Sequence, residues 1–152
     1  TGMQLEPAEI AGMAIALAFG GLMLRLPVER AASLLAAALI VLIAIQGLSP
    51  FDFQLAQDRF ALVPFGESLT HYRATNLPDM FLHCYSYGAL VWLLAGSGLS
   101  VLPATMLGAG VVFSVEFLQT WLPGHTADIT DPLLAIAAGG LIAVFERNGA
   151  TR

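Results

Sequence analysis

Glu116 is the polar residue of this 152-residue sequence that most clearly indicates chemistry, because it lies inside an apolar stretch. It precedes Pro123 by seven residues. At a rise of about 1.5 Å per residue, that spacing places it about 10 Å inside the end of a helix. An ionisable side chain at such a depth is costly and indicates a functional site. Gln119, three residues further on, shares the same helical face.

The loop that follows this stretch carries three more polar residues, His125, Asp128 and Asp131. Because the loop must turn back over the helix end that it leaves, we expect these residues to converge with Glu116 and Gln119 in one pocket.

A second polar set lies earlier in the chain, where Asp79, His83 and Tyr87 recur every four residues. This spacing places the three side chains on one face of a helix. We expect the stripe to descend from the same end of the molecule as the loop and to meet the first set.

Each of these residues also has a purely structural interpretation. Asp131 stands before Pro132, a pattern typical of a helix N-cap. Asp128 is a common turn former, and the stripe of Asp79, His83 and Tyr87 could be an interhelical ladder of hydrogen bonds. Glu116 could be held neutral by Gln119 and a tyrosine.

The sequence gives little support for the usual catalytic centres. His125, Asp128, Asp131 and Glu116 offer oxygen and nitrogen atoms to a metal, yet they lack a strong spacing signature such as HExxH. The GxSxG, Walker and CxxC patterns are all missing from the sequence. We therefore expect neither a metal nor a cofactor.

Composition assigns these residues to a membrane protein. Hydrophobic residues make up 57% of the chain and charged residues only 11%, whereas a soluble domain carries about 25% charged residues. A net charge of -5 excludes a nucleic-acid-binding protein, which needs a basic surface. The sequence begins with Thr1 rather than methionine, so a preceding segment stays an open alternative.

The apolar stretches predict an all-α, polytopic membrane protein that forms a single domain over residues 1–152, with about five transmembrane helices. The expected spans are residues 7–26, 31–48, 76–94, 103–122 and 131–145. Residues 49–78 alternate polar and aromatic side chains, which is typical of a partly helical amphipathic segment at the membrane interface.

Charge predicts the orientation of these spans, because arginines in short loops resist translocation. One face would carry four arginines against two glutamates, a net charge of +2. The opposite face would carry Arg59 and Arg73 against nine acids, a net charge of -7. We expect the acidic loops 49–78 and 123–130 to be extracytoplasmic.

Several of these motifs together resemble the VanZ-like family. The resemblance rests on Glu116-Phe117-Leu118-Gln119, on Pro123-Gly124-His125 with Asp128, Asp131 and Ala138-Gly139, on Asp79, His83 and Tyr87, and on Val63-Pro64-Phe65. These match the family patterns E-x-x-Q, P-G-R-x-x-D-x-x-D, N-x-x-G, D-K-x-x-H-x-x-x-Y and P-F. The sequence departs from them at three positions, with His125 for an arginine, Ala135 for an asparagine and Met80 for a lysine.

The resemblance implies a multi-pass protein of the bacterial inner membrane. The name-giving member of the family lowers susceptibility to the glycopeptide teicoplanin. Our leading hypothesis is a non-enzymatic protein whose polar pocket binds an envelope lipid or the headgroup of a glycan carrier. The pocket would be built from Glu116, Gln119, His125, Asp128, Asp131, Asp79, His83 and Tyr87.

Two alternatives belong to other functional classes. In the first, the protein is a membrane-embedded hydrolase or transferase in which Glu116 acts as general base and His125 assists it. In the second, it is an accessory subunit of a larger membrane complex. Its partners would then pack on small residues spaced four apart, such as Ala16 with Gly20 and Ala135 with Gly139.

Overall fold

The computed structural model describes residues 7–55, 59–64 and 76–149, with the backbone alone described at residues 7–9, 15 and 76–79. Over these ranges the chain is all-helical and contains no strand, which confirms the all-α part of the predicted fold class. The helices are α1 (Pro7–Met23), α2 (Val28–Leu48), α4 (Asn76–Gly96), α5 (Val101–Gln119) and α6 (Thr130–Gly149).

The helix bounds differ from the expected spans in both directions. Helix α2 takes in Glu29 and Arg30, and α6 runs on through Glu146 and Arg147, because polar residues continue these helices. Helices α1 and α5 end earlier than expected, at Met23 and Gln119.

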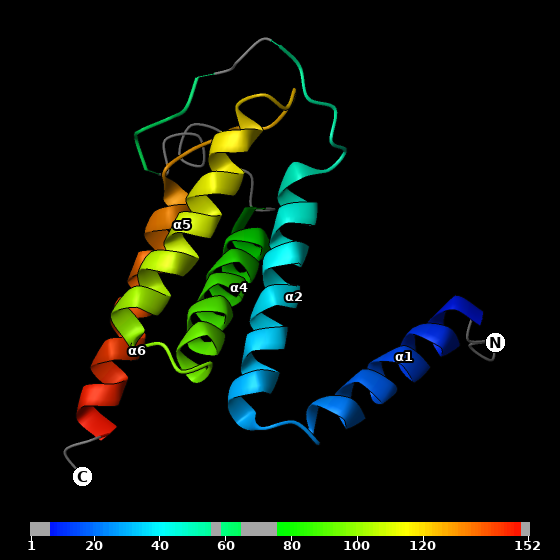
Figure 1. Ribbon diagram of the computed structural model, residues 1–152. Coiled ribbons are helices and arrows are strands. Elements are labelled where there is room, and N and C mark those ends of the chain that lie inside the picture. The colour runs from blue at the N-terminus through cyan, green and yellow to red at the C-terminus, as the bar shows by residue number, and fades with distance from the viewer. Residues whose placement is uncertain (1–6, 56–58, 65–75, 150–152) are drawn as a thin grey trace.

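Four helices form an antiparallel bundle, and the first one stands apart from it. Figure 1 shows α2, α4, α5 and α6 packed side by side, while α1 leaves the start of α2 at a wide angle. The α1 side chains Met13 and Leu17 are accordingly exposed. Helices occur at all five of the expected spans, but α1 does not join the core of the other four.

Small residues allow the bundle helices to approach one another closely. A Cβ atom built on Gly139 of α6 would collide with the side chain of Thr105 on α5, and one on Gly108 would lie 3.2 Å from Cγ2 of Val91. The small-residue face of α6 is therefore occupied within the chain and is not free for a partner. Gly20 of α1, by contrast, has no neighbouring atom within 4 Å among the described residues.

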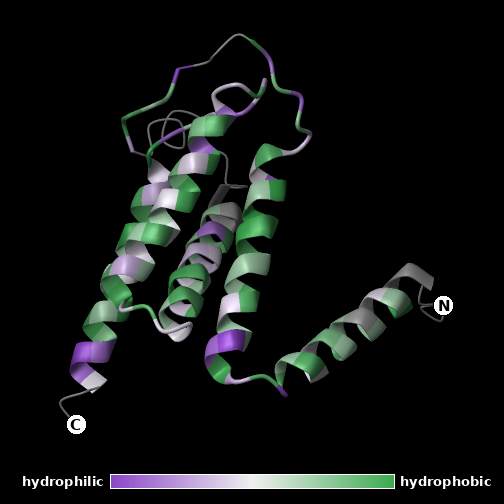
Figure 2. Cartoon of the chain, viewed as in Figure 1, coloured by the Kyte–Doolittle hydropathy of each residue, from purple (hydrophilic) through white to green (hydrophobic). Residues whose placement is uncertain are grey.

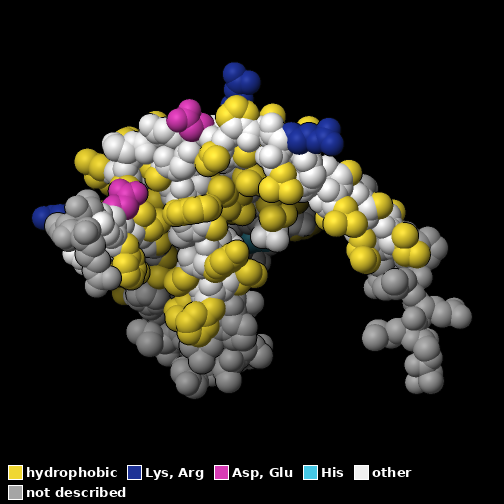
Figure 3. Space-filling view, turned by 90° about the horizontal axis from the view of Figure 1, so that it is seen from below, with side chains coloured by type: hydrophobic (Ala, Val, Ile, Leu, Met, Phe, Trp, Pro, Cys, Tyr) yellow, Lys and Arg dark blue, Asp and Glu magenta, His cyan; other side chains and the backbone are white. Residues whose placement is uncertain are grey.

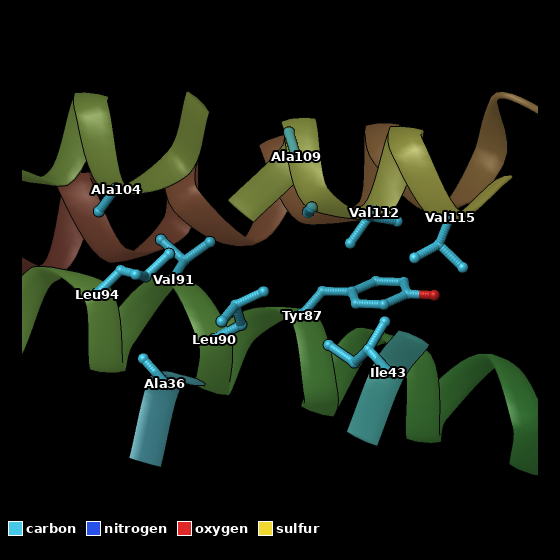
Figure 4. Close-up of a cluster of buried hydrophobic side chains, with 11 residues drawn as sticks. Ala36, Ile43, Tyr87, Leu90, Val91, Leu94, Ala104, Ala109, Val112 and Val115 are labelled. Carbon is cyan, nitrogen blue, oxygen red and sulfur yellow. The ribbon is translucent and has the colours of Figure 1, made fainter. Parts of the chain in front are cut away.

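The core is a continuous cluster of buried aliphatic side chains from α2, α4 and α5, with Ala135 from α6. Figure 4 shows Leu94, Val91 and Leu90 following one another along α4, with the ring of Tyr87 at the end of the row beneath Val112 of α5.

The outer surface of the bundle is apolar as well. Figure 2 shows hydrophobic residues along the outward faces of the helices, and large side chains such as Trp92, Leu102 and Phe145 are exposed. Among the described residues, two helices, α2 and α5, are long and apolar enough to cross a membrane. Soluble monomers rarely expose apolar surface on this scale.

The two ends of the bundle carry different charges. The turn between α1 and α2 and the end of α6 lie at one end, which holds Arg25, Arg30 and Arg147. Figure 3 looks at this end and shows a few arginine and acidic side chains among hydrophobic ones. The loops that contain residues 49–55, 59–64 and 120–129 lie at the other end.

Residues 49–55 and 59–64 run over the α5–α6 loop as a non-helical strap held by backbone hydrogen bonds. The Gln54 N–H donates to the Trp121 carbonyl at 2.9 Å, and the Ala61 N–H donates to the Ala127 carbonyl at 2.9 Å. The Ile129 N–H returns a bond of 3.1 Å to the Ala61 carbonyl. The expected helical character of segment 49–78 is not seen in these residues, and residues 65–75 lie outside the described part.

Candidate functional site

A polar cavity of about 380 Å³ lies at the loop end of the bundle, between α2, α4, α5 and the α5–α6 loop. Its volume falls in the range of about 300–1,000 Å³ that small-molecule sites occupy. Seven of the eight candidate residues line it: His83, Tyr87, Glu116, Gln119, His125, Asp128 and Asp131. The eighth, Asp79, lies on α4, but its side chain is outside the described part of the structure.

Glu116 forms the inner wall of the polar cavity and fixes the loop above it. Its side chain is buried, with 7% of the residue exposed. Its Oε2 atom accepts a hydrogen bond of 3.0 Å from the backbone N–H of Asp128. The Asp128 side chain in turn accepts a bond of 2.7 Å from the Thr130 N–H. Glu116 therefore anchors a turn that begins twelve residues away.

Asp131 joins the two polar sets that the sequence suggested. The Tyr87 hydroxyl donates a hydrogen bond of 2.5 Å to Oδ2 of Asp131. Nδ1 of His83 lies 3.1 Å from the same oxygen. The Tyr87 ring packs beside Ile43 and Val115 in the core, as Figure 4 shows, so its hydroxyl is held at the boundary between core and cavity.

The interpretation of Asp131 as the N-cap of α6 is wrong. The helix already includes Thr130, and the side chain that accepts the N–H of its first residue belongs to Asp128. Pro132 also fits a helix that starts at Thr130, because its nitrogen carries no hydrogen and the first turn of a helix needs no donor there. The Asp131 carboxylate is thus available to the polar cavity.

The carboxyl groups of Glu116 and Asp131 both line the polar cavity. Two carboxyl groups in one cavity offer several acceptor oxygens to a ligand that brings hydrogen-bond donors.

One structural interpretation of the sequence paired Gln119 with Glu116. In the structure, Gln119 bonds to a different helix. Its Nε2 donates a hydrogen bond of 3.0 Å to the carbonyl of Gly47 on α2. A Cβ atom on Gly47 would lie 3.3 Å from that nitrogen and would press on Val115. The absence of a side chain at Gly47 therefore lets α2 approach α5 beside the polar cavity.

His125 contributes a buried nitrogen to the loop that covers the polar cavity. Within the described part of the chain, its Nδ1 atom is the buried side-chain atom that lacks a hydrogen-bonding partner. A buried nitrogen left unpaired costs free energy, so such atoms in native structures call for a specific explanation.

Gln46, Ser86 and Thr126 also line the polar cavity, although the sequence did not mark them as site residues. The sequence could have identified Gln46 as a site residue, because it is a strongly polar side chain within the apolar stretch 31–48. Ser86 and Thr126 gave no such signal, since hydroxyls are common in helices and turns. Over the described ranges, no group of three His, Cys, Asp or Glu side chains is arranged to hold a metal ion.

No protein-family model matches the chain, and no curated protein or solved structure matches it with significant similarity. The resemblance to the VanZ-like family therefore depends on the motif residues alone. Function has to be inferred from the chemistry of the polar cavity and of the helix surfaces around it.

Proposed function

We propose that this chain is a non-enzymatic, multi-pass membrane protein of the VanZ-like kind, located in a bacterial inner membrane. Its polar cavity binds the hydrophilic headgroup of an envelope lipid or of a glycan carrier. One observation carries the proposal: a cavity lined by Glu116, Asp131 and His83 is enclosed by helices whose outward faces are apolar.

The helix surfaces support the membrane setting. Helices α2 and α5 have the length and composition of transmembrane helices. The bundle exposes large apolar side chains at several depths, and lipid chains would cover them. In water, the same surface would favour aggregation.

The rim of the polar cavity supports a ligand that is polar at one end and apolar at the other. The His83 side chain is 49% exposed there, and Leu82 beside it is 55% exposed. Phe81 on the preceding position is exposed as well. A headgroup that enters past His83 would leave its acyl chains against these apolar side chains.

Lipid retention tests the proposal most directly. The protein is purified from bacterial membranes in mild detergent, and native mass spectrometry then counts the lipids that stay bound. We expect a retained lipid in the wild type and in Glu146→Gln, whose carboxyl group is exposed at the far end of α6. Glu116→Gln should lose it. Equal retention in both variants would contradict the proposal.

Cysteine labelling tests the proposed orientation. The chain has a single cysteine, Cys84, so Cys84→Ala gives a clean background. We expect Asp52→Cys to react in intact cells with a membrane-impermeant maleimide. Glu29→Cys should react only after the cells are opened, and the reverse pattern would refute the orientation.

The link to glycopeptide resistance is tested in a teicoplanin-susceptible bacterium. Expression of the wild type should reduce susceptibility, and Glu116→Ala at equal membrane abundance should not. An unchanged phenotype in Glu116→Ala would remove the polar cavity from that activity.

One observation favours a second candidate, a membrane-embedded hydrolase or transferase. The carboxyl groups of Glu116 and Asp131 line the same cavity, where they would be able to donate and accept a proton. This candidate predicts turnover of a lipid-linked substrate by the purified protein and loss of turnover in Glu116→Gln. Binding without turnover would favour the first candidate.

A further inference from the structure

Three hydrogen-bond donors around the polar cavity are already engaged by the protein. The Tyr87 hydroxyl donates to Asp131, and the Asp128 N–H donates to Glu116. The Gln119 amide nitrogen donates to Gly47. These three donors hold the walls of the polar cavity together.

The acceptors of the polar cavity exceed these donors. Three carboxyl groups line it, from Glu116, Asp128 and Asp131, together with the amide oxygen of Gln119. Each carboxylate offers about four lone-pair positions, and the hydrogen bonds described above use only a few of them. A ligand that fits this wall must bring donors of its own.

Charge narrows the class of donor. The carboxyl groups of Glu116, Asp128 and Asp131 line the polar cavity, and Nδ1 of His83 lies 3.1 Å from Asp131. No lysine or arginine lines the polar cavity in the described part of the chain. Among the described residues, the lining therefore holds more acidic groups than basic ones, and a cationic donor complements it.

The unpaired Nδ1 of His125 is an independent indication of a missing donor. It belongs to the loop that covers the polar cavity, and it accepts a hydrogen bond when the other ring nitrogen carries the proton. An N–H from a ligand, after a small adjustment of the ring, would satisfy it.

We propose that the polar cavity recognises a primary ammonium group, such as that of an aminoalkyl lipid headgroup, and discriminates against anionic headgroups. This inference rests on the proposed function, and it names the headgroup chemistry. An ammonium group brings three N–H donors and one positive charge, which match the acceptor oxygens and the acidic lining of the polar cavity. A phosphate group brings acceptors and negative charge, and it matches neither.

The test uses the full-length protein in nanodiscs made from lipids with identical acyl chains. The headgroups are phosphatidylethanolamine, phosphatidylcholine and phosphatidylglycerol, and soluble ethanolamine is a fourth probe. Native mass spectrometry and thermal unfolding measure binding to each. We expect phosphatidylethanolamine to bind about tenfold more tightly than phosphatidylglycerol, as one additional charge-assisted hydrogen bond predicts.

Phosphatidylcholine separates charge from hydrogen bonding, because its quaternary ammonium has no N–H. Binding of phosphatidylcholine equal to that of phosphatidylethanolamine would overturn the inference. Glu116→Gln and Asp128→Asn should each reduce the preference, whereas Glu146→Gln should keep it. The comparison of headgroups on the wild type needs no variant, so a variant that fails to fold does not weaken the test.

The outcomes distinguish the inference from the proposed function. Preferred binding of phosphatidylglycerol, lost in Glu116→Gln, would refute the ammonium class and leave headgroup binding in place. Stabilisation by ethanolamine without retention of any lipid would support the ammonium class and refute a lipid ligand. Binding of none of the four probes would refute the ammonium inference, and the retention of lipids from bacterial membranes would then decide the proposed function separately.

Discussion

The hydroxyl of Tyr87 and the carboxylate of Asp131, 44 residues apart in the sequence, are joined by a hydrogen bond of 2.5 Å. The bond links α4 to the first turn of α6. Because the Tyr87 ring belongs to the hydrophobic core while Asp131 lines the polar cavity, the packing of the bundle positions the cavity wall. Changes at either residue are expected to affect both stability and binding.

Tyr87→Phe removes the donor and keeps the ring. We expect the free energy of unfolding to fall by about 1.5–3 kcal/mol, the usual contribution of a hydrogen bond to a charged group. Tyr85→Phe is the matched control, because Tyr85 lies on the same helix with 74% of its surface exposed. Thermal unfolding in detergent measures both variants. Equal melting temperatures would show that the Tyr87 bond contributes nothing.

Glu116→Ala leaves the backbone N–H of Asp128 without its acceptor. We expect a loss of about 1–3 kcal/mol in the free energy of unfolding, which is the cost of an unsatisfied buried donor. Glu116→Gln keeps an acceptor oxygen at the same place and should lose less. The same unfolding assay compares the two. If Ala and Gln variants were equally stable, the bond to Asp128 would not be what holds the loop.

Gly139→Ala introduces a Cβ atom where the Thr105 side chain lies. Overpacking of this kind typically costs about 1–3 kcal/mol. Gly140→Ala is the neighbouring control, because its Cβ would have no atom within 4 Å among the described residues. That substitution should stabilise the helix by up to about 1 kcal/mol. A stable Gly139→Ala variant would mean that α5 and α6 lie further apart than described.

Ala61→Pro removes the N–H that donates to the Ala127 carbonyl. We expect faster amide hydrogen exchange at Ile129, whose N–H donates to the Ala61 carbonyl. Leu62→Pro is the control, since Leu62 is exposed and lies outside the bridge between Ala61 and Asp128. Hydrogen exchange read by mass spectrometry decides between them, and identical exchange in the two variants would contradict a role for the bridge.

The helices and the set of polar residues at one end were predictable from the sequence because both follow from local patterns. Apolar stretches located the five helices, and a four-residue period placed His83 and Tyr87 on one face. Turn residues after α5 showed that the chain reverses near Glu116. These signals depend on neighbours a few residues away.

The partners across the bundle were not predictable in the same way. Asp131 carries a sequence signature that fits an N-cap and a cavity residue equally well, and only the position of Tyr87 decides between them. The bond from Gln119 to Gly47 joins residues that no local pattern relates. The contacts of the strap with the α5–α6 loop were not predictable either. They are hydrogen bonds between backbone groups, and the side-chain types in the sequence do not reveal such bonds.

The departure of α1 from the bundle has a related cause. Helix α1 is apolar on every side, so its sequence gives no direction for a core-facing side. Composition therefore indicated that the helix exists, and it left the position of the helix undetermined.

The bridge at Ala61 gives the α5–α6 loop a second attachment point, on the side away from Glu116. Substitutions in the strap are therefore expected to shift Asp128 at the wall of the cavity, with every lining side chain left native. A fluorescent reporter placed on the exposed Leu62 would register such displacements of the loop from outside.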